Sequence, residues 1–356
     1  MKFLTGLILC GVVFCFSSVA TAADGGFADR LAALEKAANQ GLPRWLNLSG
    51  AIEVEANYSS SYDKVKDSDI DLTNVELRID VPLTDYFSGY ALMKWEEDGS
   101  EGVFIDEGGI VLGSVDEYGI SVTAGKLYVP FGVFETGMIS DPLTLELGET
   151  REGAVVVDFG TGGFYGATYT FNSETSDDAD DDMIDAFGVV AGYTYETEEV
   201  SIDLSAGWIS NLTSSGGFSD YLDDASITLL DDYTSGATIS AIVGFDDFTL
   251  VGEYLTALDD DYLKAEDSKP ETWNLELGYG FKISGHDATA AVSYQGSDEA
   301  AFLGLPETRI GATVGFVIID GLGIALEYIH DEDYDTSDGG TDDSADTVTC
   351  QLALEF

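Results

Sequence analysis

The ten residues Thr347-Val348-Thr349-Cys350-Gln351-Leu352-Ala353-Leu354-Glu355-Phe356 alternate between two kinds of side chain. Every second residue from Val348 to Phe356 is apolar, and the residues between them are mainly polar or small. Because successive side chains of a strand point to opposite faces, this pattern predicts a β-strand with one apolar and one polar face. The same period of two begins after Trp45 and recurs through the chain.

Fourteen further segments with this period lie between a first strand at 48–58 and the last at 347–356. They cover residues 70–81, 88–97, 103–113, 118–130, 151–159, 164–172, 185–195, 200–210, 235–245, 248–257, 271–281, 288–296, 307–317 and 322–330. Each is close to the ~9–11 residues that a tilted strand needs to cross a bilayer. Seven short connections alternate with eight that are mostly longer and polar, as in an outer-membrane barrel. The sequence therefore predicts an all-β fold, a transmembrane antiparallel β-barrel of 16 strands.

Aromatic residues cluster beside the short connections, as in the interfacial girdle of an outer-membrane barrel. They are Tyr86, Phe87, Tyr118, Phe159, Phe164, Tyr193, Tyr195, Phe245, Phe248, Tyr279, Phe281 and Phe316, with Phe356 at the end of the last strand. The alternative is a water-soluble sandwich or lipocalin-like barrel, which would need an apolar lumen to bury sixteen apolar strand faces. The opposite faces are instead small and polar, as a water-filled lumen requires.

The first residues are typical of a secretory signal: Lys2, an apolar run from 3 to 16, and the cleavage pattern Ala20-Thr21-Ala22. We predict a signal peptide over 1–22, a short periplasmic N-terminal helix over 23–44 and the barrel over 45–356. The helix is expected to be a tether or an oligomerisation segment, with a plug of the lumen as the alternative. The predicted location is the cell outer membrane of a Gram-negative bacterium.

The chain has 67 Asp and Glu residues against 14 Lys and Arg, a formal net charge of −53. This balance argues against nucleic-acid binding, which needs basic residues to neutralise phosphates. The acidic loops are expected to attract divalent cations without forming a defined metal site. Cleavage of the signal leaves Cys350 as a single thiol, so no intrachain disulfide, Cys-based metal site or cofactor is predicted. Only His286 and His330 are present, without a Ser–His grouping, and we predict no enzyme activity.

Residues 125–150 read GKLYVPFGVFETGMISDPLTLELGET, and half of them are apolar, which is unusual for a water-exposed loop. This stretch and the strand count resemble the LbtU family of siderophore porins. More distantly the chain is similar to phosphate-type porins, which share the pattern Gly-x-x-x-x-Pro-Phe-Gly at 125–132. The resemblance implies a loop folded into the barrel at about 131–150 and passage of ferric siderophore without a plug domain.

Alternation places both signs of charge on the lumen face of the strands. The inward bases are Arg78, Lys94, Lys126, Arg151 and Arg309, and the inward acids are Glu53, Glu55, Glu76, Asp80, Asp203, Glu253, Glu276, Glu327 and Glu355. Lys126 faces inward only if a bulge near Gly125 resets the register, because a Lys at mid-bilayer costs ~2–4 kcal/mol. An acidic excess in the lumen favours cations.

The residues predicted to line the constriction and the solute path are Lys126, Glu135, Asp141, Glu146, Glu149, Arg151, Arg78, Lys94 and Arg309. The alternative for any single one is an interior ion pair that stiffens the wall, such as Glu76 with Arg78.

The predicted function is an outer-membrane porin for passive, plug-free diffusion of ferric siderophore or small solutes. The alternatives are a general cation-leaning diffusion porin and a non-transport structural or adhesive surface barrel. Expected partners are outer-membrane lipid and lipopolysaccharide, and the barrel-insertion machinery through the strand ending at Phe356. The sequence leaves open whether the barrel forms a homo-oligomer.

Overall fold

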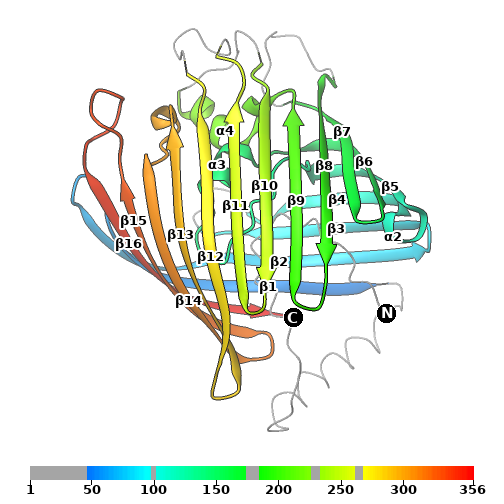
Figure 1. The fold of residues 1–356 in the computed structure, drawn as a ribbon, viewed down its shortest axis with the longest axis horizontal. Helices are drawn as coiled ribbons and strands as arrows, with labels where there is room; N and C mark the ends of the chain where they lie inside the picture. The colour runs from blue at the N-terminus through cyan, green and yellow to red at the C-terminus, as the bar shows by residue number, and fades with distance from the viewer. Residues whose placement is uncertain (1–45, 98–101, 174–183, 226–232, 261–267) are drawn as a thin grey trace.

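Sixteen antiparallel strands pair in chain order and close into a barrel (Figure 1). The structure, a computed structural model, describes residues 46–97, 102–173, 184–225, 233–260 and 268–356. The predicted all-β barrel of sixteen strands is confirmed. The signal peptide predicted over 1–22 and the helix predicted over 23–44 lie outside the described residues.

Each predicted strand overlaps an observed one. The strands are β1 (Asn47–Ser60), β2 (Lys66–Thr84), β3 (Phe87–Trp95), β4 (Phe104–Ser114), β5 (Ile120–Tyr128), β6 (Arg151–Thr161), β7 (Phe164–Phe171), β8 (Ala186–Glu196), β9 (Val200–Ile209), β10 (Gly236–Phe245), β11 (Phe248–Ala257), β12 (Glu271–Ile283), β13 (His286–Asp298), β14 (Thr308–Ile319), β15 (Leu322–Glu332) and β16 (Ser344–Glu355).

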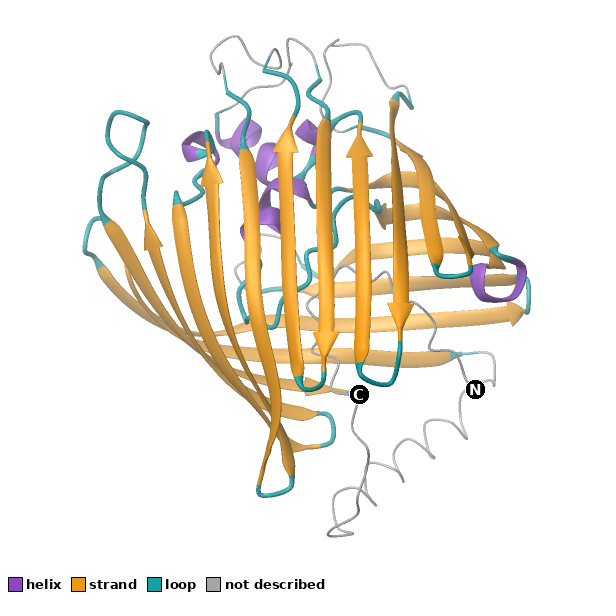
Figure 2. Cartoon of the chain, viewed as in Figure 1, coloured by secondary structure: helices purple, strands orange, loops and turns teal. Residues whose placement is uncertain are grey.

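Short helices interrupt some of the connections, and those in the long loops gather at one end of the barrel (Figure 2). They are α2 (Val115–Tyr118), α3 (Leu143–Gly148), the 3-10 turn η1 (Leu212–Ser214), α4 (Gly216–Asp224) and the 3-10 turn η2 (Ala301–Leu303). Within the described ranges, no helix has the length and apolar character needed to cross a membrane.

Short turns and longer loops alternate around the barrel, so they lie at opposite ends (Figure 1). The turn between β12 and β13 shows why the short ones are tight. Ser284 and Gly285 have φ angles of 53° and 91°, the left-handed conformation that a two-residue hairpin turn needs to match the twist of its strands. The predicted alternation of connection lengths is therefore present.

The barrel closes where β1 pairs with β16, from Ala51 opposite Glu355 to Ser60 opposite Asp346. The backbones of Gly50 and Phe356 exchange two further hydrogen bonds, of 3.0 and 3.1 Å. A side chain at position 50 would collide with the Glu76 carbonyl oxygen and the Phe356 ring, so the seam requires glycine there.

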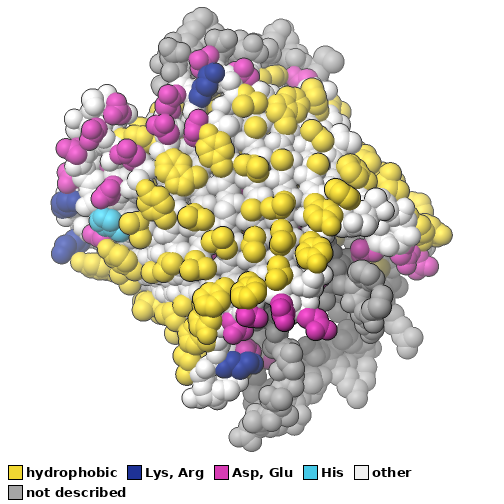
Figure 3. All heavy atoms as spheres, in the orientation of Figure 1, with side chains coloured by type: hydrophobic (Ala, Val, Ile, Leu, Met, Phe, Trp, Pro, Cys, Tyr) yellow, Lys and Arg dark blue, Asp and Glu magenta, His cyan; other side chains and the backbone are white. Residues whose placement is uncertain are grey.

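The two faces of the wall differ as the alternation predicts. On β15 the outward Leu326 is 50% exposed, whereas its neighbours Ala325 and Glu327 are 8% and 2% exposed. Figure 3 shows apolar side chains spread over the wall, with Asp and Glu gathered toward its ends. Rings at the short turns are exposed and stack on one another, as Tyr86 does on Tyr118 at 5.0 Å. The outer wall is thus suited to hydrocarbon, with aromatic rings at one border.

Candidate constriction site

The connection between β5 and β6, residues 129–150, lies inside the barrel and carries α3. Phe131, Met138, Leu143 and Leu147 of this loop are at most 1% exposed. Helix α3 contacts the inner side of β11, β12 and β13. This inner loop crosses the lumen and rests on the wall opposite the strands from which it starts.

Four wall side chains hold the inner loop by accepting hydrogen bonds from it. The bonds run from Val133 N and Phe134 N to Glu253 (2.7 and 3.0 Å), from Thr144 Oγ1 to Glu253 (2.9 Å), from Thr136 Oγ1 and Gly137 N to Glu276 (2.6 and 2.7 Å), from Ile139 N and Ser140 N to Glu327, and from Leu143 N to Gln295 (2.8 Å). Glu253, Glu276, Gln295 and Glu327 are therefore the loop anchors. Hydrogen bonds to a charged acceptor are the stronger kind, so the anchors fix the path of the loop.

Three of the inward acids bind the inner loop and do not line open lumen. Alternation predicts that Glu253, Glu276 and Glu327 face inward, and they do. Each is at most 6% exposed and covered by the inner loop. None of the four anchors is among the residues predicted to line the constriction, and Gln295, at 0% exposed, is not among the predicted inward residues either. Acids at inward positions on β11, β12 and β15 are the only signal in the sequence that could have marked such anchors.

The acids of the inner loop itself behave differently. The side-chain carboxylates of Glu135, Asp141, Glu146 and Glu149 make no hydrogen bond or ion pair with any described residue, so they remain available to solute. Burial raises the pKa of all four carboxyls. For Glu149, burial and then the nearby Asp141 raise the pKa from 4.5 to about 7.

Four of the five predicted inward bases are paired. Salt bridges join Arg78 to Asp80 (3.1 Å), Lys94 to Glu96 (2.8 Å), Arg309 to Asp331 (2.8 Å) and Arg151 to Asp106. Arg78 also lies 4.4 Å from the centre of the Tyr90 ring. Glu76 accepts from Asn74 and is not the ion-pair partner of Arg78. Each of these four bases thus has its own carboxylate, which lowers its attraction for an anionic solute.

Asp141 and Glu149 lie where the inner loop meets these pairs. Asp141 interacts electrostatically with Lys94, Glu55 and Arg309. Glu149 interacts with Asp141, Lys94 and Arg151. The edge of the loop that carries its free acids therefore faces charged side chains of β1, β3, β6 and β14, away from the anchors on β11–β13. This edge is the candidate constriction.

Lys126 does not belong to the candidate constriction. The ladders of β5 with β4 and β6 run without a register shift through Lys126, so the bulge expected near Gly125 is absent. The shift lies one strand earlier, where Leu92 pairs with Glu107 and Met93 with Ile105. Lys126 keeps the outward face of Ile120 and is exposed. It lies two residues from the end of β5, where a long side chain can reach the membrane border and keep its charge in water.

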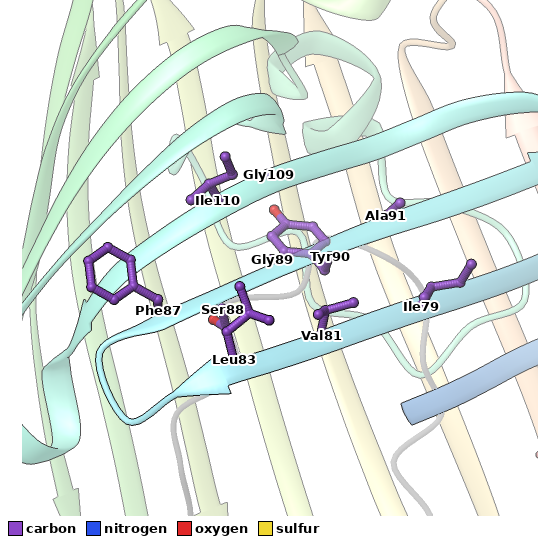
Figure 4. Close-up of a pocket in the computed structure, with 10 residues that line it drawn as sticks. All are labelled: Ile79, Val81, Leu83, Phe87, Ser88, Gly89, Tyr90, Ala91, Gly109 and Ile110. Atoms are coloured by element: carbon purple, nitrogen blue, oxygen red, sulfur yellow. The ribbon is translucent and has the colours of Figure 1, made fainter. Parts of the chain in front are cut away.

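An apolar groove of about 360 Å³ lies on the outer side of β2, β3 and β4 (Figure 4). Its floor includes Gly89 and Ala91, and Ile79, Val81 and Ile110 stand around it. These residues are on the outward-facing side of their strands, so the groove is separate from the lumen. Within the described part of the chain, no three His, Cys, Asp or Glu side chains are grouped to hold a metal ion.

The barrel resembles solved channels over nearly its whole length. An anion-selective porin from Comamonas acidovorans is 13% identical and has a TM-score of 0.61, with 87% of this chain and 99% of that one covered. OprB of Pseudomonas putida is 10% identical, also with a TM-score of 0.61, and 93% and 97% are covered. This is a porin fold. The outer membrane channel DcaP of Acinetobacter baumannii shares it with 14% identity and a TM-score of 0.56, over 87% and 97% of the chains.

Two relatives are similar to this chain in sequence. A UPF0422 protein of Coxiella burnetii is 26% identical over 304 residues, which is 80% of this chain and 64% of the relative. A UPF0422 protein of Legionella pneumophila strain Lens is 25% identical over 355 residues, covering 87% and 66%. The chain thus spans about two thirds of the length of these relatives. No family model matches the chain.

Proposed function

We propose that this protein is a passive diffusion channel of a Gram-negative outer membrane, with a constriction that favours cations and neutral solutes over anions. The observation that carries the proposal is the asymmetry of the constriction. The loop acids Asp141 and Glu149 lack partners among the described residues, while Arg78, Lys94, Arg151 and Arg309 are all neutralised by carboxylates. Acidic rings favour cations in channels.

The membrane location is supported by the outer wall. Apolar side chains face outward along the strands, and exposed rings such as Tyr86 and Phe164 lie beside the short turns. The porin fold points to a channel rather than an enzyme. Relatives in Coxiella and Legionella, together with porins among the similar structures, support a Gram-negative outer membrane.

The finer proposal is that the solute is a ferric siderophore. It rests on the resemblance of residues 125–152 to siderophore porins. The acidic constriction adds a condition, because a neutral or cationic complex would pass more readily than one with a large negative charge. The proposed path needs no plug to be displaced.

The test is the purified barrel in a planar bilayer with a salt gradient. We expect stepwise conductance and a reversal potential of the sign that marks cation selectivity. The double variant Asp141→Asn/Glu149→Gln should lose much of that selectivity. Asp116→Asn/Glu117→Gln, in the exposed turn helix α2, is the matched control and should keep it.

Strong anion selectivity of the unaltered protein would overturn the proposed constriction. Conductance that no ferric siderophore blocks would leave a general cation-leaning channel. A folded barrel without any conductance would favour the structural or adhesive surface barrel.

A further inference from the structure

The loop between β9 and β10 folds inward over the inner loop. Helix α4 of this loop contacts α3. The backbone N–H of Gly216 donates to the Glu149 carbonyl at 2.9 Å. A side chain at Gly217 would collide with the backbone carbonyl of Glu146, so α4 lies directly on the inner loop.

This packing is part of an apolar core inside the barrel. Phe218 and Leu222 of α4 are 1% and 5% exposed and join the same buried cluster as Phe134, Leu147 and Leu255. The cluster continues along the inner side of β6 to β9. Hydrated ions and polar solutes do not enter such a region, because burying a polar group without a partner is costly.

A third loop holds α4 from the other side. The Phe302 ring of η2 meets the Tyr221 ring edge-on at 5.0 Å and lies 6.2 Å from the Phe218 ring. Aromatic pairs in these arrangements stabilise a contact beyond the area they bury. Phe302 is therefore the contact that joins the β13–β14 loop to α4.

The η2 turn is fixed in its own right. The Tyr334 hydroxyl lies 2.6 Å from Ser297 Oγ and accepts from Ala300 N at 3.3 Å. Ala300 and Leu305 pack on Leu143 of the inner loop. The position of Phe302 thus depends on two further loops, which leaves α4 a rigid surface to rest on.

We infer that α4 and η2 form a cap that closes the β6–β13 side of the lumen to solutes, and that Phe302 and Gly217 set the size limit of the pore by seating it. This inference rests on the proposed channel function. The cap leaves the passage between the acidic edge of the inner loop and the strands that face it. A weakened cap exposes more of the lumen and leaves the acids of the constriction in place.

The experiment compares Phe302→Ala and Gly217→Ala with the unaltered barrel in planar bilayers. Phe302→Ala removes the ring on which α4 rests, and Gly217→Ala pushes α4 off the inner loop. We expect higher single-channel conductance and entry of larger poly(ethylene glycol) sizes in both, with cation selectivity unchanged. Gly217→Ala also decides the question if Phe302→Ala does not fold.

Phe187→Ala is the matched control, because it removes one ring of an outward pair, Phe187 with Trp208 at 5.4 Å. It should conduct like the unaltered protein. A conducting unaltered barrel whose size limit stays the same in both cap variants overturns the cap alone. A barrel that conducts in none of its forms overturns the proposed channel.

Discussion

At the scale of single residues, one side-chain type performs two tasks in the lumen. Glu253, Glu276 and Glu327 are covered by the inner loop and accept its N–H and hydroxyl groups. Glu149 and Asp141 have no such donors among the described residues. A carboxylate with its lone pairs occupied is part of the scaffold, whereas one left open can interact with a passing cation.

Removal of an anchor should loosen the inner loop. Glu276→Ala leaves the Gly137 N–H and the Thr136 hydroxyl without their acceptor, and an unmet buried donor costs about 1–3 kcal/mol. We expect a lower midpoint of urea unfolding, measured in detergent by tryptophan fluorescence. Glu117→Ala, at an exposed turn, should change the free energy of unfolding by at most about 0.5 kcal/mol. Equal midpoints would contradict the role of Glu276 as an anchor.

Cation selectivity should depend on pH through Glu149. Its pKa is raised to about 7 by burial, so its charge is lost as the pH falls through neutrality. We expect the reversal potential to shift toward lower cation selectivity between about pH 8 and about pH 6, with no such step in Glu149→Gln. The raised pKa of Glu149 also makes the stability of the barrel depend on pH. Because the folded state holds this proton more tightly than the unfolded state, the protonated Glu149 stabilises the fold fully below pH 4.5, and this stabilisation is lost as the pH rises through about 7. A step of equal size in Glu149→Gln would assign the titration to another group.

At the scale of elements, side-chain alternation located all sixteen strands. One face of each strand is suited to lipid and the other to the lumen, so apolar and polar residues alternate along it. This pattern failed at the bulge in β4. Gly108 and Gly109 carry no side chain to mark a face, so the extra residue, Asp106, could not be placed from the pattern. The sequence also could not show which inward acids anchor the loop. Glu253 and Phe134 are more than a hundred positions apart, and no local period links them.

The outward face of β15 offers a depth test. Leu326→Arg places a charge near the middle of the strand, where it should cost about 2–4 kcal/mol, while Leu322→Arg lies at the turn end, where the cost falls to about 0–1 kcal/mol. Reversible folding into lipid vesicles in urea measures both. Equal costs would argue that this face of β15 does not contact hydrocarbon.

At the scale of the whole molecule, the chain carries a net charge of −53, and the acidic side chains that the structure describes lie mainly in the lumen and toward the ends of the barrel. Like charges in the loops repel one another over about 30 Å at ~0.01 M salt but only about 10 Å at ~0.1 M. We expect the thermal midpoint in neutral detergent to rise with NaCl. MgCl₂ at equal ionic strength should act alike if no defined metal site forms, and a much larger effect at micromolar Mg²⁺ would reveal one.

The seam between β1 and β16 has a consequence for how the barrel is assembled. Gly50 and Phe356 are about 300 positions apart in the sequence. Contacts at such separation form late, because closing a long loop costs chain entropy before any contact rewards it. Until they form, two strands present rows of unpaired N–H and C=O groups, which hydrocarbon does not tolerate and which invite pairing with other chains. The barrel is therefore most vulnerable to misassembly in the interval before β1 pairs with β16. The close approach of the two strands at the end of this seam requires the glycine at position 50.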